Sequence, residues 1–323
     1  MKALGGFFEL EQRHGRGPWH TGALALTSGR ACFRKILEMA RPSRMLVPFF
    51  ICDAALEPLR MLGVPFEFYV LTASLDPAVS TWPSDASVLY VNYFDLKNDG
   101  AAALVSALDG RAVVDDTQAF FRRGHGRGWS FNSARKSFGV PDGAYAYGPG
   151  LAGATAGSAR EHVKSAHLTT RMTGPQDLAY QQYLEAEADV SAEVIAPSAM
   201  ARDLLSAIAY EDARQARRRN YSVVHDRLSK MNMLDMKVAL GTHDEGTAPF
   251  CYPLLPLRPS LHQALWRRQI FVPRLWPEVV TRPGAGFAWE RDLASRLLPL
   301  PIDHRYDERD MNQLCDDVLE VAA

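Results

Sequence analysis

The sequence lacks the excess positive charge and the long apolar runs that mark nucleic-acid-binding and membrane-spanning proteins. Lysine and arginine together number 36 and aspartate and glutamate 37, so the formal net charge is -1. Without an excess of basic residues there is little electrostatic attraction for nucleic acid, and we expect no nucleic-acid partner. No apolar run approaches the roughly 20 residues that cross a bilayer, so no membrane partner is expected.

The chain also lacks paired cysteines, a secretory signal and a metal-ligand pattern. Its four cysteines are far apart and form no CxxC pair: Cys32, Cys52, Cys251 and Cys315. The N-terminal residues contain no apolar signal core. These features predict a reduced, cytoplasmic protein whose cysteines mainly serve packing. The adjacent His243, Asp244 and Glu245 favour a polar turn, because adjacent ligands rarely converge on one ion, and no metal is expected.

What the sequence does contain is a regular alternation of strand-like and helix-like segments. The predicted strands are Ala23–Leu26, Met45–Phe50, Pro65–Val70 and Val88–Tyr93. The predicted helices between and after them are Arg30–Ala40, Ala54–Leu62 and Ala101–Leu108. Continuous apolar strands that alternate with helices predict an α/β fold, with a mostly parallel central sheet and helices on both of its faces.

The second half of the chain predicts long helices followed by a smaller α/β lobe. Gln176–Ala192 and Ala199–Leu228 are helical in pattern, and we place the run Arg217–Arg219 on a solvated face. From Pro249 onward, proline and glycine separate short strands and helices. We therefore divide the chain into a large domain, 1–175, and a second part, 176–323, of linking helices and a small C-terminal domain.

The stretch from Ala112 to Tyr147 contains the residues with the clearest chemical meaning. The paired acids Asp115 and Asp116 follow an apolar strand, and Lys136 follows a later one. Pyridoxal phosphate (PLP) chemistry needs these two groups: a lysine that holds the cofactor as a Schiff base, and a carboxylate that keeps the pyridine nitrogen protonated. The stretch therefore predicts a PLP site.

Polar residues at other predicted strand ends favour a ligand site at the same edge of the sheet. Ser28, Asn92 and Asp116 all fall at carboxyl ends of strands, where ligands bind in such sheets. The turn Ser28-Gly29-Arg30 precedes a helix, whose free N–H groups and dipole would bind a phosphate. The alternative for this turn is a plain strand-to-helix connection capped by Ser28.

Several motifs, in order along the chain, resemble the DegT/DnrJ/StrS sugar aminotransferase family of fold-type-I PLP enzymes. LTSGRA resembles the small-residue phosphate turn of that family, AVVDDTQA its acid-containing strand, SFNSARK the segment that ends in the Schiff-base lysine, and GVPDG the turn after it. RQIFVPRLWP and LLPLPIDHRYDERDMNQLCDDV resemble its C-terminal lobe. The resemblance covers most of the chain.

The resemblance implies a role for each matched residue. Lys136 would be the Schiff-base lysine, Asp116 the partner of the pyridine nitrogen and Gln118 a ring contact. Ser130 would contact the phosphate, with one residue inserted between it and Lys136. Cys52 occupies the position where an aromatic residue stacks on the ring.

The function that the resemblance implies is that of a PLP-dependent aminotransferase. It would move an amino group from an amino-acid donor to a keto sugar or another small keto metabolite. The alternatives are a PLP-dependent lyase or dehydratase on the same fold, or a binding protein that has lost the chemistry. The resemblance also implies a homodimer with shared active sites, in which Ser198 would reach across the interface; the alternative is that Ser198 only caps its own helix.

Overall fold

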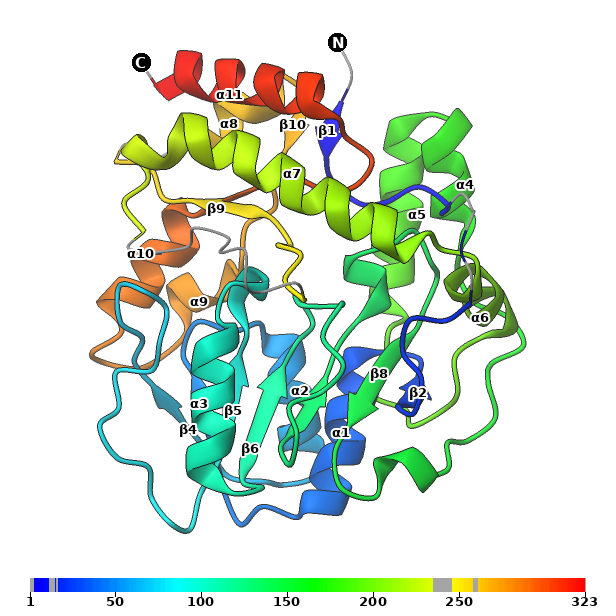
Figure 1. Cartoon of the computed structure of the whole chain (residues 1–323), viewed down its shortest axis with the longest axis vertical. Coiled ribbons are helices and arrows are strands. Elements are labelled where there is room, and N and C mark those ends of the chain that lie inside the picture. Colours follow the sequence, from blue (N-terminus) through cyan, green and yellow to red (C-terminus); the bar gives the residue numbers. More distant parts are fainter. Residues whose placement is uncertain (1–2, 12–14, 16, 235–245, 258–260, 323) are drawn as a thin grey trace.

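The central feature of the molecule is a seven-stranded sheet covered by helices (Figure 1). The computed structural model describes residues 3–11, 15, 17–234, 246–257 and 261–322. In sheet order the strands are β2 (Leu24–Leu26), β8 (Ala144–Tyr147), β7 (Trp129–Phe131), β6 (Ala112–Asp115), β5 (Ser87–Val91), β3 (Met45–Pro48) and β4 (Phe66–Tyr69).

The sheet is mostly parallel, as the sequence predicts. The strands from β7 to β4 pair in parallel, and only β8 runs antiparallel to its neighbours β7 and β2. The central strands β5 and β6 have nearly continuous apolar sequences, because helices cover both faces and leave no face for polar side chains. Helix α3 (Asn98–Leu108) lies in front of the sheet, and α1 (Gly29–Ala40) and α2 (Asp53–Met61) lie behind it (Figure 1).

Helix α1 shows how local sequence places the edge of the candidate site. Ser28 is its N-cap, with extended backbone angles, and its side chain accepts the N–H of Ala31. Its apolar, buried residues pack it against β2, β7 and β8 of the sheet: Ala31, Cys32, Phe33, Ile36 and Leu37. The helix ends at Arg41, which adopts the left-handed conformation.

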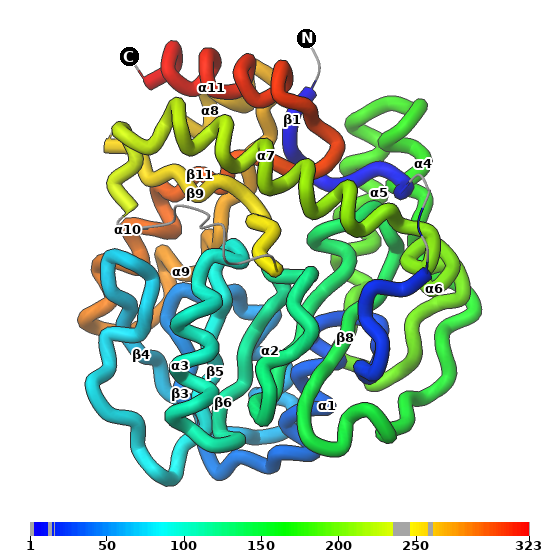
Figure 2. Tube along the Cα trace, viewed as in Figure 1, coloured from blue at the N-terminus to red at the C-terminus, as the bar shows by residue number. Residues whose placement is uncertain are grey.

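A second, smaller lobe contains segments from both ends of the chain. Its elements are β1 (Leu4–Gly5), β9 (Tyr252–Leu254), β10 (Ile270–Phe271), β11 (Leu298–Leu300), α7 (Tyr210–Leu228), α8 (Leu261–Arg267) and α11 (Glu308–Ala322). Strand β1 pairs with β10, so the first described residues run beside the C-terminal lobe (Figure 2). The proposed division into 1–175 and 176–323 stays a prediction, and β1 crosses it.

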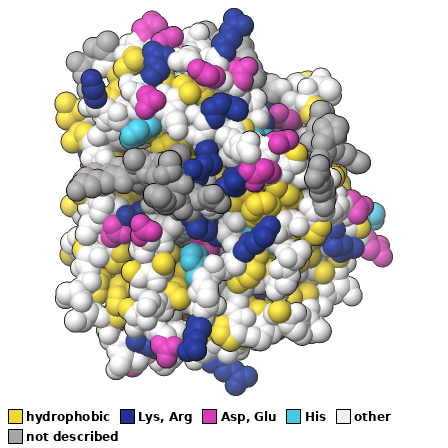
Figure 3. Space-filling model, viewed as in Figure 1, with side chains coloured by type: hydrophobic (Ala, Val, Ile, Leu, Met, Phe, Trp, Pro, Cys, Tyr) yellow, Lys and Arg dark blue, Asp and Glu magenta, His cyan; other side chains and the backbone are white. Residues whose placement is uncertain are grey.

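Further helices complete the described part of the chain. They are α4 (Ala166–Thr173), α5 (Gln176–Ala188), α6 (Ala199–Ser206), α9 (Glu278–Thr281) and α10 (Ala288–Arg296). The segment 199–228, predicted to be mostly helical, contains two helices, α6 and α7, separated at residues 207–209. No helix among the described residues is long and apolar enough to cross a membrane. Charged side chains of both signs are interspersed on the face shown in Figure 3.

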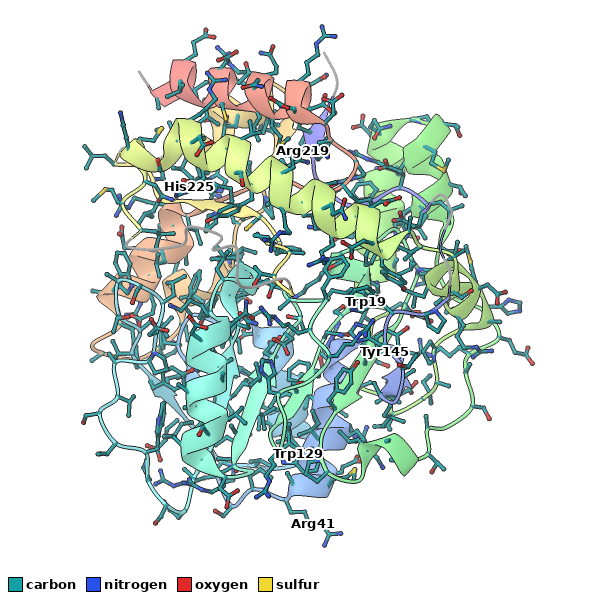
Figure 4. The ribbon with its side chains drawn as sticks, viewed as in Figure 1. Trp19, Arg41, Trp129, Tyr145, Arg219 and His225 are labelled. Carbon is teal, nitrogen blue, oxygen red and sulfur yellow. The ribbon has the colours of Figure 1, made fainter. Side chains whose placement is uncertain are left out.

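The prediction of a solvated face for Arg217–Arg219 is wrong for Arg217. Its side chain is fully buried and donates to the backbone carbonyls of Ser137 (3.0 Å) and Phe250 (3.2 Å). Arg219, two residues further along α7, is exposed (Figure 4). Arg217 therefore links the C-terminal lobe to the backbone that directly follows Lys136.

Candidate active site

Lys136 is the last residue of a short 3-10 turn, η2 (Ala134–Lys136), just after β7. Its half-buried side chain donates from Nζ to Thr117 Oγ1 at 2.8 Å. The turn is fixed on both sides, because the N–H of Ala134 donates to the carbonyl of Gly143 and Arg217 holds the carbonyl of Ser137. The amine is thus directed toward the carboxyl end of β6.

Asp115, the last residue of β6, is the carboxylate on the same side as Lys136. Its Oδ1 accepts the N–H of Thr117 at 2.8 Å, and Thr117 is also the partner of the lysine. Burial raises the pKa of Asp115, while the positive charge of Lys136 acts in the opposite direction. An amine and a buried carboxylate therefore meet at Thr117.

Asp116, the predicted partner of the pyridine nitrogen, points to the other side of the strand end. Its Oδ1 accepts from Asn92 Nδ2 at 2.9 Å, and its Oδ2 lies 2.7 Å from His125 Nε2. Neighbouring residues of an extended chain face opposite sides, so only one of the two acids can face Lys136. The structure places Asp115 on the side of Lys136, and the role of Asp116 at the pyridine nitrogen stays a prediction.

His125 is a site residue that the sequence reasoning missed. It lies in a glycine-rich loop nine positions after Asp116, and its ring is almost fully buried against that carboxylate. Burial disfavours its charged form, but the charge and the hydrogen bond of Asp116 outweigh this and raise the pKa of His125. The glycine-flanked spelling Gly124-His125-Gly126 is the only sequence signal that could have indicated it.

The predicted phosphate turn lies beside Thr117. A Cβ on Gly29 would stand 3.1 Å from Thr117 Cγ2 and 3.3 Å from the carbonyl oxygen of Asn132, so the missing side chain lets α1 begin against the site. The N–H groups of Gly29 and Arg30 lie in the first turn, where a helix has no internal acceptors for them. Ser28 caps the helix, as predicted, and also donates to the carbonyl of Ser191 at 2.7 Å.

Cys52 also lies at this site. It precedes α2 and is half-buried, unlike the other three cysteines. Burial raises its pKa, the charge of Lys136 lowers it and the charge of Asp115 raises it, so the thiol lies within the electrostatic reach of both groups. Cys52 follows the carboxyl end of β3, so the predicted ring-stacking position lies at the same edge of the sheet as Asp115.

Three predicted cofactor contacts lie away from Lys136. Asn92 is bound to Asp116, and the Oε1 of Gln118 accepts the N–H of Phe94 at 2.9 Å. Ser130 pairs with Val114 in the sheet, so it shares the face opposite to Asp115. Its buried Oγ has no hydrogen-bond partner among the described residues. Asn92 follows the end of β5, as predicted, whereas Ser130 is the middle residue of β7.

Ser198 is engaged within its own chain. Its Oγ accepts the N–H of Ala201 as the N-cap of α6, and it donates to Asp142 Oδ1 at 3.2 Å. The cap is confirmed, and the hydroxyl that was expected to reach across an interface is buried against Asp142.

A buried acid, Asp95, extends the polar network on the Asp116 side. Its Oδ2 accepts the N–H of Ala248 at 2.6 Å, and its Oδ1 lies 3.4 Å from Arg122 Nε. Burial raises the pKa of Asp95 to about 7. Phe94 and Asp95 both adopt positive φ (62° and 61°), an uncommon backbone for residues other than glycine. Within the described residues no cluster of metal ligands occurs, and His243–Glu245 lie outside them.

Comparison with known proteins identifies the fold. No family model and no curated protein matches the sequence. A DegT DnrJ EryC1 StrS aminotransferase from Brucella abortus is similar in structure, with a TM-score of 0.63 at 14% identity over 93% of this chain and 86% of that one. The chain has the fold of these aminotransferases.

Two further structures agree. The sugar aminotransferase CalS13 from Micromonospora echinospora gives a TM-score of 0.61 at 13% identity, over 93% of this chain and 87% of its own. The aminotransferase TlmJ from Streptoalloteichus hindustanus gives 0.62 at 14% identity, over 99% of both chains. The predicted fold class, that of fold-type-I PLP enzymes, is confirmed, and the similarity spans both lobes.

Proposed function

We propose that this protein is a PLP-dependent aminotransferase that transfers an amino group from an amino acid to a keto sugar or another small keto metabolite. The observation that carries the proposal is the 2.8 Å hydrogen bond from Lys136 to Thr117, beside the buried carboxylate of Asp115. The fold supports it, because similar structures include the PLP and PMP forms of a putative sugar aminotransferase from Streptococcus pneumoniae.

The residues around Lys136 fit the chemical parts of PLP. The lysine amine suits the aldehyde, the carboxylate of Asp115 suits the pyridine nitrogen, and the first-turn N–H groups of Gly29 and Arg30 suit the phosphate. Burial raises the pKa of Asp115 against the charge of Lys136. A protonated pyridine nitrogen would add a second positive charge and stabilise the ionised carboxylate. We therefore assign to Asp115 the role first expected of Asp116.

When bound, PLP supplies an electron-accepting ring that stabilises negative charge on the substrate. The protein contributes proton transfer and orientation. Lys136 Nζ is the base that removes the proton from the substrate Cα, and Thr117 orients it through their hydrogen bond. Asp115 keeps the proton on the ring nitrogen, and α1 holds the phosphate with its N-terminal N–H groups.

A keto sugar is our choice of acceptor because several structures with this fold are sugar aminotransferases. One of them, DesI, was solved in the presence of its TDP-sugar product. We also propose a cytoplasmic homodimer. Two observations support it: the four cysteines are free thiols, and Leu178, Tyr180 and Leu184 expose apolar surface on α5. Sedimentation at micromolar protein tests the dimer, for which we expect twice the chain mass.

The test of the proposed function is the visible spectrum of the protein with PLP. We expect an absorbance band that disappears when glutamate is added and returns with a nucleotide-linked keto sugar, while Lys136→Ala shows neither change. A band that responds only with loss of water, carbon dioxide or a leaving group from the substrate would indicate a lyase or dehydratase. Failure to bind PLP would contradict the proposal and favour a non-catalytic binding protein.

A further inference from the structure

The turn between β3 and α2, residues 49–52, carries Cys52 and is bonded only in part by its own neighbours: the carbonyl of Cys52 accepts the N–H of Ala55 in α2, and that of Phe49 accepts the N–H of Ile51. Buried carbonyls need hydrogen-bond donors from elsewhere. The hydroxyl of Tyr93 donates to the carbonyl of Phe50 at 2.6 Å. The carbonyls on either side, those of Phe49 and Ile51, are bound by a residue of the C-terminal half of the chain.

That residue is Arg282, at the C-terminal end of α9. Its Nη1 donates to the carbonyl of Phe49, and its Nη2 donates to the carbonyl of Ile51 at 2.7 Å and to Asp53 Oδ1 at 2.9 Å. The guanidinium is buried, 8% exposed, and lies 5.4 Å from the ring centre of Phe49. One planar group with several donors thus binds three positions of the turn, which a single lysine amine cannot match.

Glu278, at the start of α9, binds the same turn from the other side of Cys52. Its Oε1 accepts the N–H of Asp53 at 2.9 Å. The residues before and after Cys52 are therefore both bonded to α9, whereas Cys52 makes no side-chain capping bond of its own. Two aromatic contacts add to this attachment: Phe287 stacks on Phe49 at 3.9 Å between ring centres, and Trp276 lies 4.8 Å from Phe50.

We propose that Arg282, supported by Glu278, is a positioning residue that fixes Cys52 at the carboxyl edge of the sheet, the edge that also holds Asp115 and the amine of Lys136. Helix α9 then determines how closely this wall of the site approaches a bound cofactor. The effect on the cofactor rests on the proposed function, but the placement of the turn does not. Arg282 acts through the backbone of residues 49–53.

Alkylation of cysteine by iodoacetamide, followed by peptide mapping, tests the proposal on the protein without PLP. Cys52 is half-buried and the other three cysteines are buried, so its rate reports the position of the turn. We expect Arg282→Gln to speed the alkylation of Cys52 about tenfold, because hydrogen bonds from a charged donor to the turn are lost. Arg282→Lys, which keeps the charge and part of the bonding, should give an intermediate rate.

Arg268→Gln is the matched control. Arg268 lies in the same half of the chain and pairs with Asp317 and Glu320, each at 2.6 Å, away from the turn. This variant should leave the rate at Cys52 unchanged. Wild-type reactivity of Cys52 in Arg282→Gln would overturn the proposal. If all four cysteines of that variant react faster, Arg282→Lys decides: selective acceleration at Cys52 supports positioning, and any other pattern overturns it.

The absorbance of the PLP-loaded protein provides a second readout. In Arg282→Gln we expect PLP to be held about tenfold more weakly and the absorbance maximum to shift, with recovery in Arg282→Lys. Unchanged PLP binding and spectrum would contradict the link between the turn and the cofactor. If the wild-type protein takes up no PLP, the proposed function fails, and the alkylation rates still decide the placement of Cys52.

Discussion

Asp115 and Asp116 are adjacent acids with different surroundings, although both are buried at the end of β6. Asp116 has a partner for each oxygen: Asn92, directly after β5, and His125, in the loop between β6 and β7. Asp115 accepts one backbone N–H and faces the amine of Lys136 across Thr117. The protein itself satisfies both oxygens of Asp116. Around Asp115, in contrast, it combines groups that are suited to bind and react with a ligand.

The comparison teaches that burial and charge alone do not identify a catalytic acid. What separates the two residues is the partner that each one faces. Asp115 has a pKa raised by burial and countered by Lys136, so its ionisation responds to any further charge placed in the site. Asp116 is bonded to groups that are themselves fixed in the fold, as expected of an acid that stabilises structure.

Replacing each acid by its amide should show most clearly that Asp115 and Asp116 differ in their importance for activity. We expect Asp115→Asn to slow amine transfer from glutamate by about 100-fold or more, because the charge next to the ring nitrogen is lost. Asp116→Asn should retain most of the activity. Single-turnover rates from the cofactor absorbance measure both.

The same pair should show the opposite order in stability. Asp116→Asn should lower the free energy of unfolding by about 2 kcal/mol, since its charged hydrogen bonds are weakened in a buried site. Denaturant titrations of the two variants check this. If Asp116→Asn were the inactive variant and Asp115→Asn the active one, the roles that we assign to the two acids would have to be exchanged.

Gly29→Ala tests how closely α1 must approach Thr117. The added methyl group would stand 3.1 Å from Thr117 Cγ2, so α1 or Thr117 must move. We expect about tenfold weaker retention of PLP and a loss of roughly 1 to 3 kcal/mol of stability. Gly153→Ala is the control, because nothing lies within 4 Å of its added carbon. Equal effects of the two substitutions, measured by PLP titration, would show that the approach of α1 is unimportant.

Thr117→Val tests the hydroxyl that joins the two reactive groups. Valine keeps the shape of the side chain but cannot accept the hydrogen bond from Lys136. We expect a rate of amine transfer about fivefold lower, with PLP still bound, since the hydrogen bonds of the hydroxyl to Lys136 and Asp115 are lost while the backbone N–H to Asp115 remains. Thr117→Ser, which keeps the hydroxyl, should restore the rate; a valine variant as active as the serine variant would argue against orientation by Thr117.

The smallest effect is expected for the contribution of His125, the partner of Asp116, to the stability of the protein. Because the pKa of His125 is raised in the folded protein, its contribution to stability is fully present below pH about 6.5 and is lost as the pH rises through the raised value. Wild type should therefore exceed His125→Gln in stability at pH 6, and the gap should narrow toward pH 8. Unfolding titrations across this range measure the gap, and a gap that widens with pH would contradict the assigned role.

The sequence predicted the elements of the site better than the directions of its side chains. The strand before the acids, the helix after Ser28 and the turn with Lys136 follow from local pattern and capping. The choice between Asp115 and Asp116 depends on which side of the end of β6 faces Lys136, whose amine is bonded to Thr117, 19 positions earlier in the chain. Local pattern does not contain that long-range contact.

Buried polar contacts between distant segments were likewise beyond prediction. Arg217 looked like part of a solvated run, yet it is buried because the carbonyls of Ser137 and Phe250 supply its partners. Arg282 contacts a turn more than 200 positions earlier in the chain. In both cases the pattern of one helix gives no information about the carbonyl groups that meet it in the folded protein.

The central claim is that Lys136 is the residue that binds PLP, with Asp115 as its partner. Borohydride reduction of the PLP-loaded protein, followed by peptide mapping, tests it most directly. We predict one adduct, on Lys136, which is absent in Lys136→Ala and still forms in Asp116→Asn. An adduct on another lysine, or none after incubation with PLP, would contradict the account.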